Sequence, residues 1–127
     1  NIAEWTLSEN NIDLMILCLG ANDMLRGINP KETKNNLEEI IQIAKNKNIK
    51  VIIAGMIAPT SYGFAYKKSF DKIFSDLSKK YKLQLIPFLL EGVAQKPEFN
   101  LSDGMHPNDQ GTIIIGNTLK KAILKNL

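Results

Sequence analysis

A continuous apolar run, Leu14-Met15-Ile16-Leu17-Cys18-Leu19, ends at Gly20 and constrains the fold more than any other stretch of the chain. A short apolar run that stops at a glycine is typical of a β-strand. Because no polar residues alternate with the apolar ones, we expect both faces of this strand to be covered, as is usual in parallel sheets. The run therefore predicts an α/β protein rather than an all-β or all-helical one.

Helical patterns alternate with further apolar runs along the rest of the chain. Asn29-Pro30 predicts a helix start, with Asn as the N-cap and Pro in the first helical position. Strands that alternate with helices indicate right-handed βαβ units around a parallel sheet. The first predicted elements are a helix tail in residues 1–9 that ends at Asn10-Asn11, a strand at 14–19, a helix at 29–47, a strand at 50–54 and a loop at 57–63. A second helix follows, with Phe70, Ile73, Phe74, Leu77 and Tyr81 on its apolar face, and then a strand at 83–86. An irregular connection at 88–107 leads to a last helix from about Asn108, which buries Ile115, Leu119, Ala122 and Ile123.

Composition excludes several classes of protein. With 127 residues, the chain forms one domain at most. The net charge of +3 comes from lysines spread over predicted helix faces, so nucleic-acid binding is not indicated. No run of 18 apolar residues occurs, and we expect no membrane span. Cys18 is the single cysteine, which excludes an intrachain disulfide, and its place in the apolar run predicts a buried structural thiol.

Two polar clusters follow predicted strands. Asp103-Gly104-Met105-His106-Pro107 contains the single histidine, three residues after an aspartate. Histidine is suited to proton transfer near neutral pH, and a carboxylate can fix its tautomer. Gly20-Ala21-Asn22-Asp23 follows the first strand. Because ligands bind beyond the carboxyl ends of parallel strands, we expect both clusters at the same rim.

These residues resemble the SGNH (GDSL-type) hydrolases, and within them the bacterial arylesterase, acyl-CoA thioesterase and lysophospholipase group. Gly20-Ala21-Asn22-Asp23 is similar to the family's G-x-N-D block, and Asp103-Gly104-Met105-His106-Pro107 to its D-x-x-H-P block. The stretches Leu25-Arg26-Gly27, Pro59 through Tyr66, and Pro87-Phe88 to Lys96-Pro97 also look like that group. The resemblance implies a three-layer α/β/α fold with a flavodoxin-like parallel sheet, and a small acyl ester or thioester as substrate without a cofactor. It also implies a periplasmic or secreted protein, with a cytoplasmic one as the alternative.

The resemblance implies roles for individual residues. His106 would be the general base, Asp103 would orient it, and Asn22 would donate its side-chain amide to the oxyanion. Asp23 would support the loop through hydrogen bonds. The substrate-facing positions would be Gly20, where the backbone turns off the strand, and Pro59 and Tyr62, for which simple loop packing is an equal alternative.

The chain departs from the family at the nucleophile. The family's Gly-Asp-Ser block near the N-terminus is absent from these 127 residues, and none of Ser8, Ser61, Ser69, Ser75, Ser78 or Ser102 follows a strand as a nucleophile should. We therefore expect residues 1–127 to be a single partial domain, the C-terminal two-thirds of such an enzyme, which lacks the first two strands and is inactive alone. Without those strands, the apolar run at 14–19 would be an exposed sheet edge, which favours self-association.

Three other functions compete with a hydrolase. A catalytically inactive relative would only bind acyl or carbohydrate ligands. A metal site at Asp103, His106 and Asp109 is disfavoured because no further His or Cys is near in sequence. A flavodoxin-like nucleotide-binding protein ranks last, since no Gly-rich phosphate loop occurs.

Overall fold

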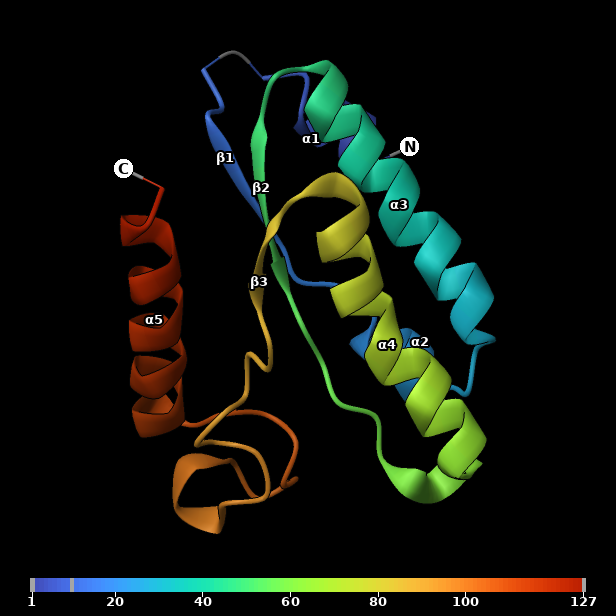
Figure 1. Cartoon of the computed structure of the whole chain (residues 1–127). Helices are drawn as coiled ribbons and strands as arrows, with labels where there is room; N and C mark the ends of the chain where they lie inside the picture. The colour runs from blue at the N-terminus through green and yellow to red at the C-terminus, as the bar shows by residue number, and fades with distance from the viewer. Residues whose placement is uncertain (1, 10, 127) are drawn as a thin grey trace. The chain divides into compact units, whose positions relative to one another are not determined.

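The computed structural model describes residues 2–9 and 11–126. They fall into two compact units, divided between Pro87 and Phe88. The first unit contains a parallel sheet of three strands, β1 (Leu14–Leu17), β2 (Lys50–Ala54) and β3 (Gln84–Ile86), in the order β1-β2-β3 (Figure 1). In this sheet Leu14 pairs with Lys50, and Ile52 pairs with Gln84. The prediction of an α/β protein with a parallel sheet is confirmed.

Helices α3 (Pro30–Asn46) and α4 (Phe64–Tyr81) connect the strands. Because the strand order follows the chain order, right-handed crossovers place both helices on the same face of the sheet. Figure 1 shows α3 and α4 lying alongside each other there. The core between helices and sheet is fully buried and consists of Ile41 from α3, Ile52 and Ile53 from β2, and Phe70 and Leu77 from α4.

Local sequence signals account for the helix ends. The side chain of Asn29 accepts a hydrogen bond from the backbone N–H of Lys31, and Pro30 occupies the first turn, as predicted. The short helix α1 (Ile2–Thr6) agrees with the predicted helix in residues 1–9. Asn10, at the predicted end of that helix, lies outside the described residues, and Asn11 has a left-handed φ of 70°.

The first strand is shorter and less buried than the apolar run predicts. It ends at Leu17, Leu19 is 52% exposed, and Leu14, Met15 and Ile16 are only partly buried. The prediction of two covered faces is wrong, because the connecting helices α3 and α4 lie on one face of this unit's sheet. Among the described strands, β1 is also at the edge of the sheet and pairs with β2 alone. The predicted burial of Cys18 is also wrong, because its side chain is exposed just beyond the strand.

The second unit consists of an irregular connection, the 3₁₀ turn η2 (Pro97–Phe99) and the helix α5 (Asp109–Leu124), which begins after Asn108 as predicted. Ala122 is buried, whereas Ile115, Leu119 and Ile123 are only partly buried. The predicted burial is confirmed for Ala122 alone, because α5 is the one long helix in the described part of this unit and no strand there covers it. No helix among residues 2–9 and 11–126 is both long and apolar enough to cross a bilayer.

Candidate active site

Asp103 and His106 form a hydrogen-bonded pair in the loop before α5. The imidazole Nδ1 of His106 lies 2.6 Å from Oδ2 of Asp103. The other carboxylate oxygen, Oδ1, accepts hydrogen bonds from the backbone N–H groups of Met105 (2.9 Å) and His106 (3.0 Å). The aspartate therefore holds both the imidazole ring and the backbone that carries it.

The same hydrogen bonds set the protonation state of the pair. They lower the pKa of Asp103 from 3.8 to about 2, with the backbone N–H of His106 as the largest cause and its ring as the next. At neutral pH the carboxylate is therefore ionised and can only accept hydrogen bonds. Nδ1 of His106 must then carry the proton, which leaves Nε2 as the ring atom that can take one up.

The base of this loop is held by residues that carry no functional signal in the sequence. The backbone N–H of Leu101 donates to the carbonyl of His106 (2.8 Å), and Asn100 and Pro107 form an isolated bridge. The side chain of Asn100 donates to the carbonyls of Val93 and Lys96, at 2.8 Å each. These bonds close the loop on itself, although the side chain of His106 is 72% exposed.

A second polar cluster lies after β1 in the first unit. Gly20 has a φ of 113°, a left-handed value that L side chains rarely adopt, and it caps the five-residue helix α2 (Ala21–Leu25). The side chain of Asn22 is exposed on α2. Gly20, Asn22, Asp23 and Thr33 line a hollow of about 370 Å³, so two of the predicted site residues, Gly20 and Asn22, share one cavity.

Asp23 anchors α2 to the next helix. Its Oδ2 accepts a hydrogen bond from Oγ1 of Thr33 (2.8 Å), a side chain that is only 1% exposed. Its backbone carbonyl accepts the N–H of Ile28 (3.0 Å). These contacts agree with the supporting role expected for Asp23.

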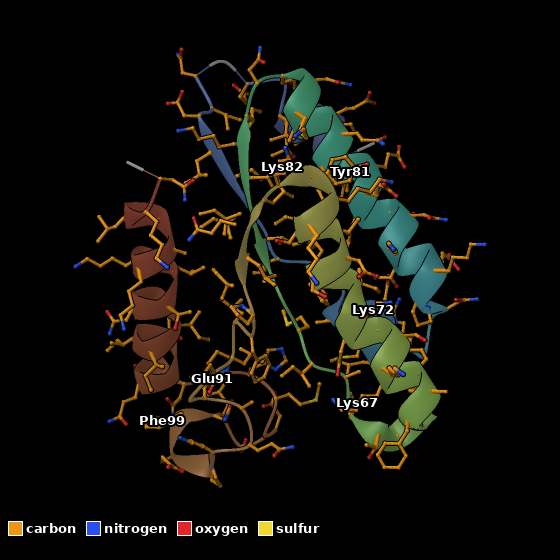
Figure 2. The ribbon with its side chains drawn as sticks, in the orientation of Figure 1. Lys67, Lys72, Tyr81, Lys82, Glu91 and Phe99 are labelled. Atoms are coloured by element: carbon orange, nitrogen blue, oxygen red, sulfur yellow. The ribbon has the colours of Figure 1, made fainter. Side chains whose placement is uncertain are left out.

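The predicted loop at 57–63 contains the 3₁₀ turn η1 (Thr60–Tyr62) and is tied to α4 at its start. Asp71 Oδ1 accepts the backbone N–H of Ala58 (2.6 Å), and Nζ of Lys67 donates to the Ala58 carbonyl (3.0 Å). Figure 2 shows Lys67 in the first part of α4. Further along the loop Pro59 is exposed, and Tyr62 is 50% exposed.

Cys18 also lines the hollow beside Asn22. Partial desolvation raises the pKa of its thiol, which disfavours the nucleophilic thiolate. Among the described residues, no three His, Cys, Asp or Glu side chains gather as the ligands of a metal ion would. The hollow is lined by neutral polar side chains, one carboxylate and apolar side chains such as Leu19 and Ile40.

Residues 3–112 match the GDSL-like Lipase/Acylhydrolase family. The chain belongs to this family. An arylesterase from Vibrio mimicus is 35% identical over 121 residues, which are 95% of this chain and 60% of that protein. Thioesterase 1/protease 1/lysophospholipase L1 from Escherichia coli is 34% identical over 105 residues, or 83% of this chain and 50% of that protein. The chain thus spans about half or somewhat more of these relatives.

Solved structures of family members have the same fold. The crystal structure of TesA superposes with a TM-score of 0.91 at 29% identity, over 98% of this chain and 69% of that chain. The psychrotrophic esterase EstA from a Pseudoalteromonas species, inhibited by monoethylphosphonate, gives 0.90 at 26% identity, over 96% and 67%. The family fold accordingly extends over nearly the whole of residues 1–127.

Proposed function

We propose that this chain supplies the acid–base pair and one oxyanion donor of an ester or thioester hydrolase that works through an acyl-enzyme. The observation that carries the proposal is the Asp103–His106 pair, with Nδ1 bound to an ionised carboxylate and Nε2 available for a proton. Relatives named arylesterase and thioesterase support this substrate class. The substrate would be a small acyl ester or thioester.

The chemistry assigns one step to each group. As a serine oxygen attacks the acyl carbon, Nε2 of His106 takes the hydroxyl proton, and the carbonyl electron pair moves onto oxygen. The Asn22 amide would donate to that oxyanion. When the tetrahedral intermediate collapses, the bond to the leaving alcohol or thiol breaks, and His106 returns the proton to it. Water then repeats the sequence on the acyl-enzyme.

The nucleophile, in this proposal, lies outside residues 1–127. Two serine hydroxyls of this chain already donate to backbone carbonyls: Ser8 to that of Trp5 (2.6 Å) and Ser78 to that of Leu83 (2.7 Å). Ser102 is next to Asp103 but belongs to the same loop. Residues 1–127 would then form the C-terminal part of a single hydrolase domain, which is inactive without its serine.

A serine-directed fluorophosphonate probe with intact-mass detection tests the assignment of the nucleophile. We expect no adduct on the 127-residue chain. We expect one adduct when a family segment that carries the Gly-Asp-Ser block is fused ahead of residue 1. An adduct on a serine of this chain would overturn the assignment.

Turnover of p-nitrophenyl acetate by the same fusion tests the reaction. We expect His106→Ala to lower kcat by about 100- to 10,000-fold, the usual contribution of a general base. Lys120→Ala, an exposed position on α5, is the matched control. A cooperatively folded fusion that binds acyl ligands without turnover would favour the alternative, a catalytically inactive acyl- or carbohydrate-binding domain.

We also propose that the isolated chain associates with a second copy through the edge of β1. If the two-fold axis of an antiparallel pair lies between Met15 and Ile16, Leu14 of one copy is opposite Leu17 of the other. An apolar hollow of about 510 Å³ borders the strand, and Trp5 on α1 is 77% exposed nearby in the sequence. An apolar edge strand of this kind is a template for pairing.

A further inference from the structure

The segment that follows Asn22 receives hydrogen bonds from two tyrosines that are distant in sequence. The hydroxyl of Tyr62, in η1, donates to the backbone carbonyl of Leu25 (3.2 Å). The hydroxyl of Tyr66, in α4, donates to the carbonyl of Ile28 (2.8 Å). Both acceptors lie at or just after the end of α2, where helix carbonyls have no partner within the helix.

The helix α2 needs such external support. It has five residues and no side-chain N-cap hydrogen bond, and helices of this length are unstable by themselves. The backbone N–H of Arg26 bonds to the carbonyl of Asn22 (3.0 Å), so the turn after α2 and the residue at its start are directly linked. A displacement of this turn therefore moves Asn22.

Packing adds to the hydrogen bonds. Gly27 has a φ of 65°, and a Cβ there would lie 2.6 Å from Cε1 of Tyr62, so the aromatic ring rests directly on the glycine backbone. The Tyr62 and Tyr66 rings are 5.4 Å apart, and Tyr66 stacks on the fully buried Phe70 at 6.1 Å. The two hydroxyls are thus held by a row of rings that reaches into the core.

The phenol of Tyr66 is kept in the form that can donate. Burial raises its pKa above 10.0, and the nearby carboxylate of Asp23 raises it further. At neutral pH the hydroxyl therefore keeps the proton that it donates to the Ile28 carbonyl.

We propose that Tyr62 and Tyr66 are positioning residues for Asn22: they clamp the turn at residues 25–28 and thereby fix the orientation of the Asn22 side-chain amide. The consequence for catalysis depends on the proposed role of Asn22, whereas the clamp itself does not. Tyr62 would then act on the reaction through the backbone of α2, and not through contact with the acyl group.

Hydrogen exchange and NMR on the 127-residue chain test the clamp without substrate. We expect Tyr66→Phe, which removes only the hydroxyl, to speed amide exchange at Arg26, Gly27 and Ile28 by about 5-fold, as the loss of one hydrogen bond predicts. The side-chain NH₂ resonances of Asn22 should shift in the same variant. Tyr62→Phe, at a half-exposed residue, should give smaller changes of the same kind.

Tyr81→Phe is the matched control, because Tyr81 lies at the far end of α4 and its hydroxyl donates to Glu38 (2.6 Å) (Figure 2). Unchanged exchange and unchanged Asn22 resonances in both test variants would overturn the clamp, as would equal changes in Tyr81→Phe. In the active fusion, Tyr66→Phe should lower kcat about 5-fold with KM unchanged. If exchange rises but kcat does not fall, the clamp stands and the oxyanion role of Asn22 is wrong.

Discussion

The Asp103 carboxylate binds both the side chain and the backbone of His106: its Oδ2 lies 2.6 Å from the ring Nδ1, and its Oδ1 accepts the backbone N–H of His106 at 3.0 Å. This double attachment is local, since the partners are only three positions apart in sequence. Because the side chains of His106 and Asp103 are 72% and 45% exposed, solvent screens their charges, and the geometry of the hydrogen bonds keeps the pair ordered. The pair can therefore form in this chain without contributions from distant elements.

Replacement of Asp103 by Asn should randomise the imidazole tautomer. The neutral amide keeps the shape of the side chain but can also present its NH₂ group to Nδ1. Ring ¹⁵N chemical shifts of the 127-residue chain should then show a mixture of tautomers, and kcat of the active fusion should fall by about 1,000- to 10,000-fold. Asp109→Asn, in the first turn of α5, is the control. An unchanged tautomer in Asp103→Asn would contradict this prediction.

Acid should break the hydrogen bonds between Asp103 and its loop only at very low pH. The folded pKa of Asp103 is about 2, below its ordinary 3.8, so its contribution to stability is fully present above about pH 3.8 and is lost as the pH falls through about 2. The amide proton shifts of Met105 and His106 should therefore titrate with a midpoint near 2 in an NMR series. A midpoint near 3.8 would show that the carboxylate does not hold these amides.

Two glycines of α5 should respond in opposite directions to the same substitution. At Gly111 a Cβ would clash with the backbone carbonyl of Phe99, whereas nothing lies within 4 Å of one at Gly116 (Phe99 is labelled in Figure 2). Gly111→Ala should destabilise the chain by about 1–3 kcal/mol. Gly116→Ala should stabilise it by about 0.5–1 kcal/mol, because alanine favours the helix. Chemical denaturation measures both, and equal effects would contradict the close approach of η2 to α5.

Sequence reasoning succeeded where the determinants are local. Strand β2, the Asn29 cap of α3 and the start of α5 after Asn108 follow from propensity and capping within a few residues. The Asp103–His106 pair belongs to the same class, since its spacing already brings the partners together. The end of β1 at Leu17 was not predictable, because the apolar run continues to Leu19 while the pairing with β2 does not. The bonds of Tyr62 and Tyr66 to the carbonyls near α2 span 37 and 38 residues, and only the tertiary fold creates them.

The edge of β1 leads to the last prediction, which concerns the oligomeric state. Sedimentation velocity of the 127-residue chain should show a concentration-dependent dimer. Ile16→Lys should make it monomeric, because a lysine on an edge strand opposes pairing by charge repulsion and by the cost of burying its ammonium group. Ile113→Lys, at a 64% exposed apolar position on α5, should leave the dimer intact. A wild-type chain that stays monomeric at all concentrations would exclude the pairing, and a dimer lost only in Ile113→Lys would assign it to α5 instead of β1.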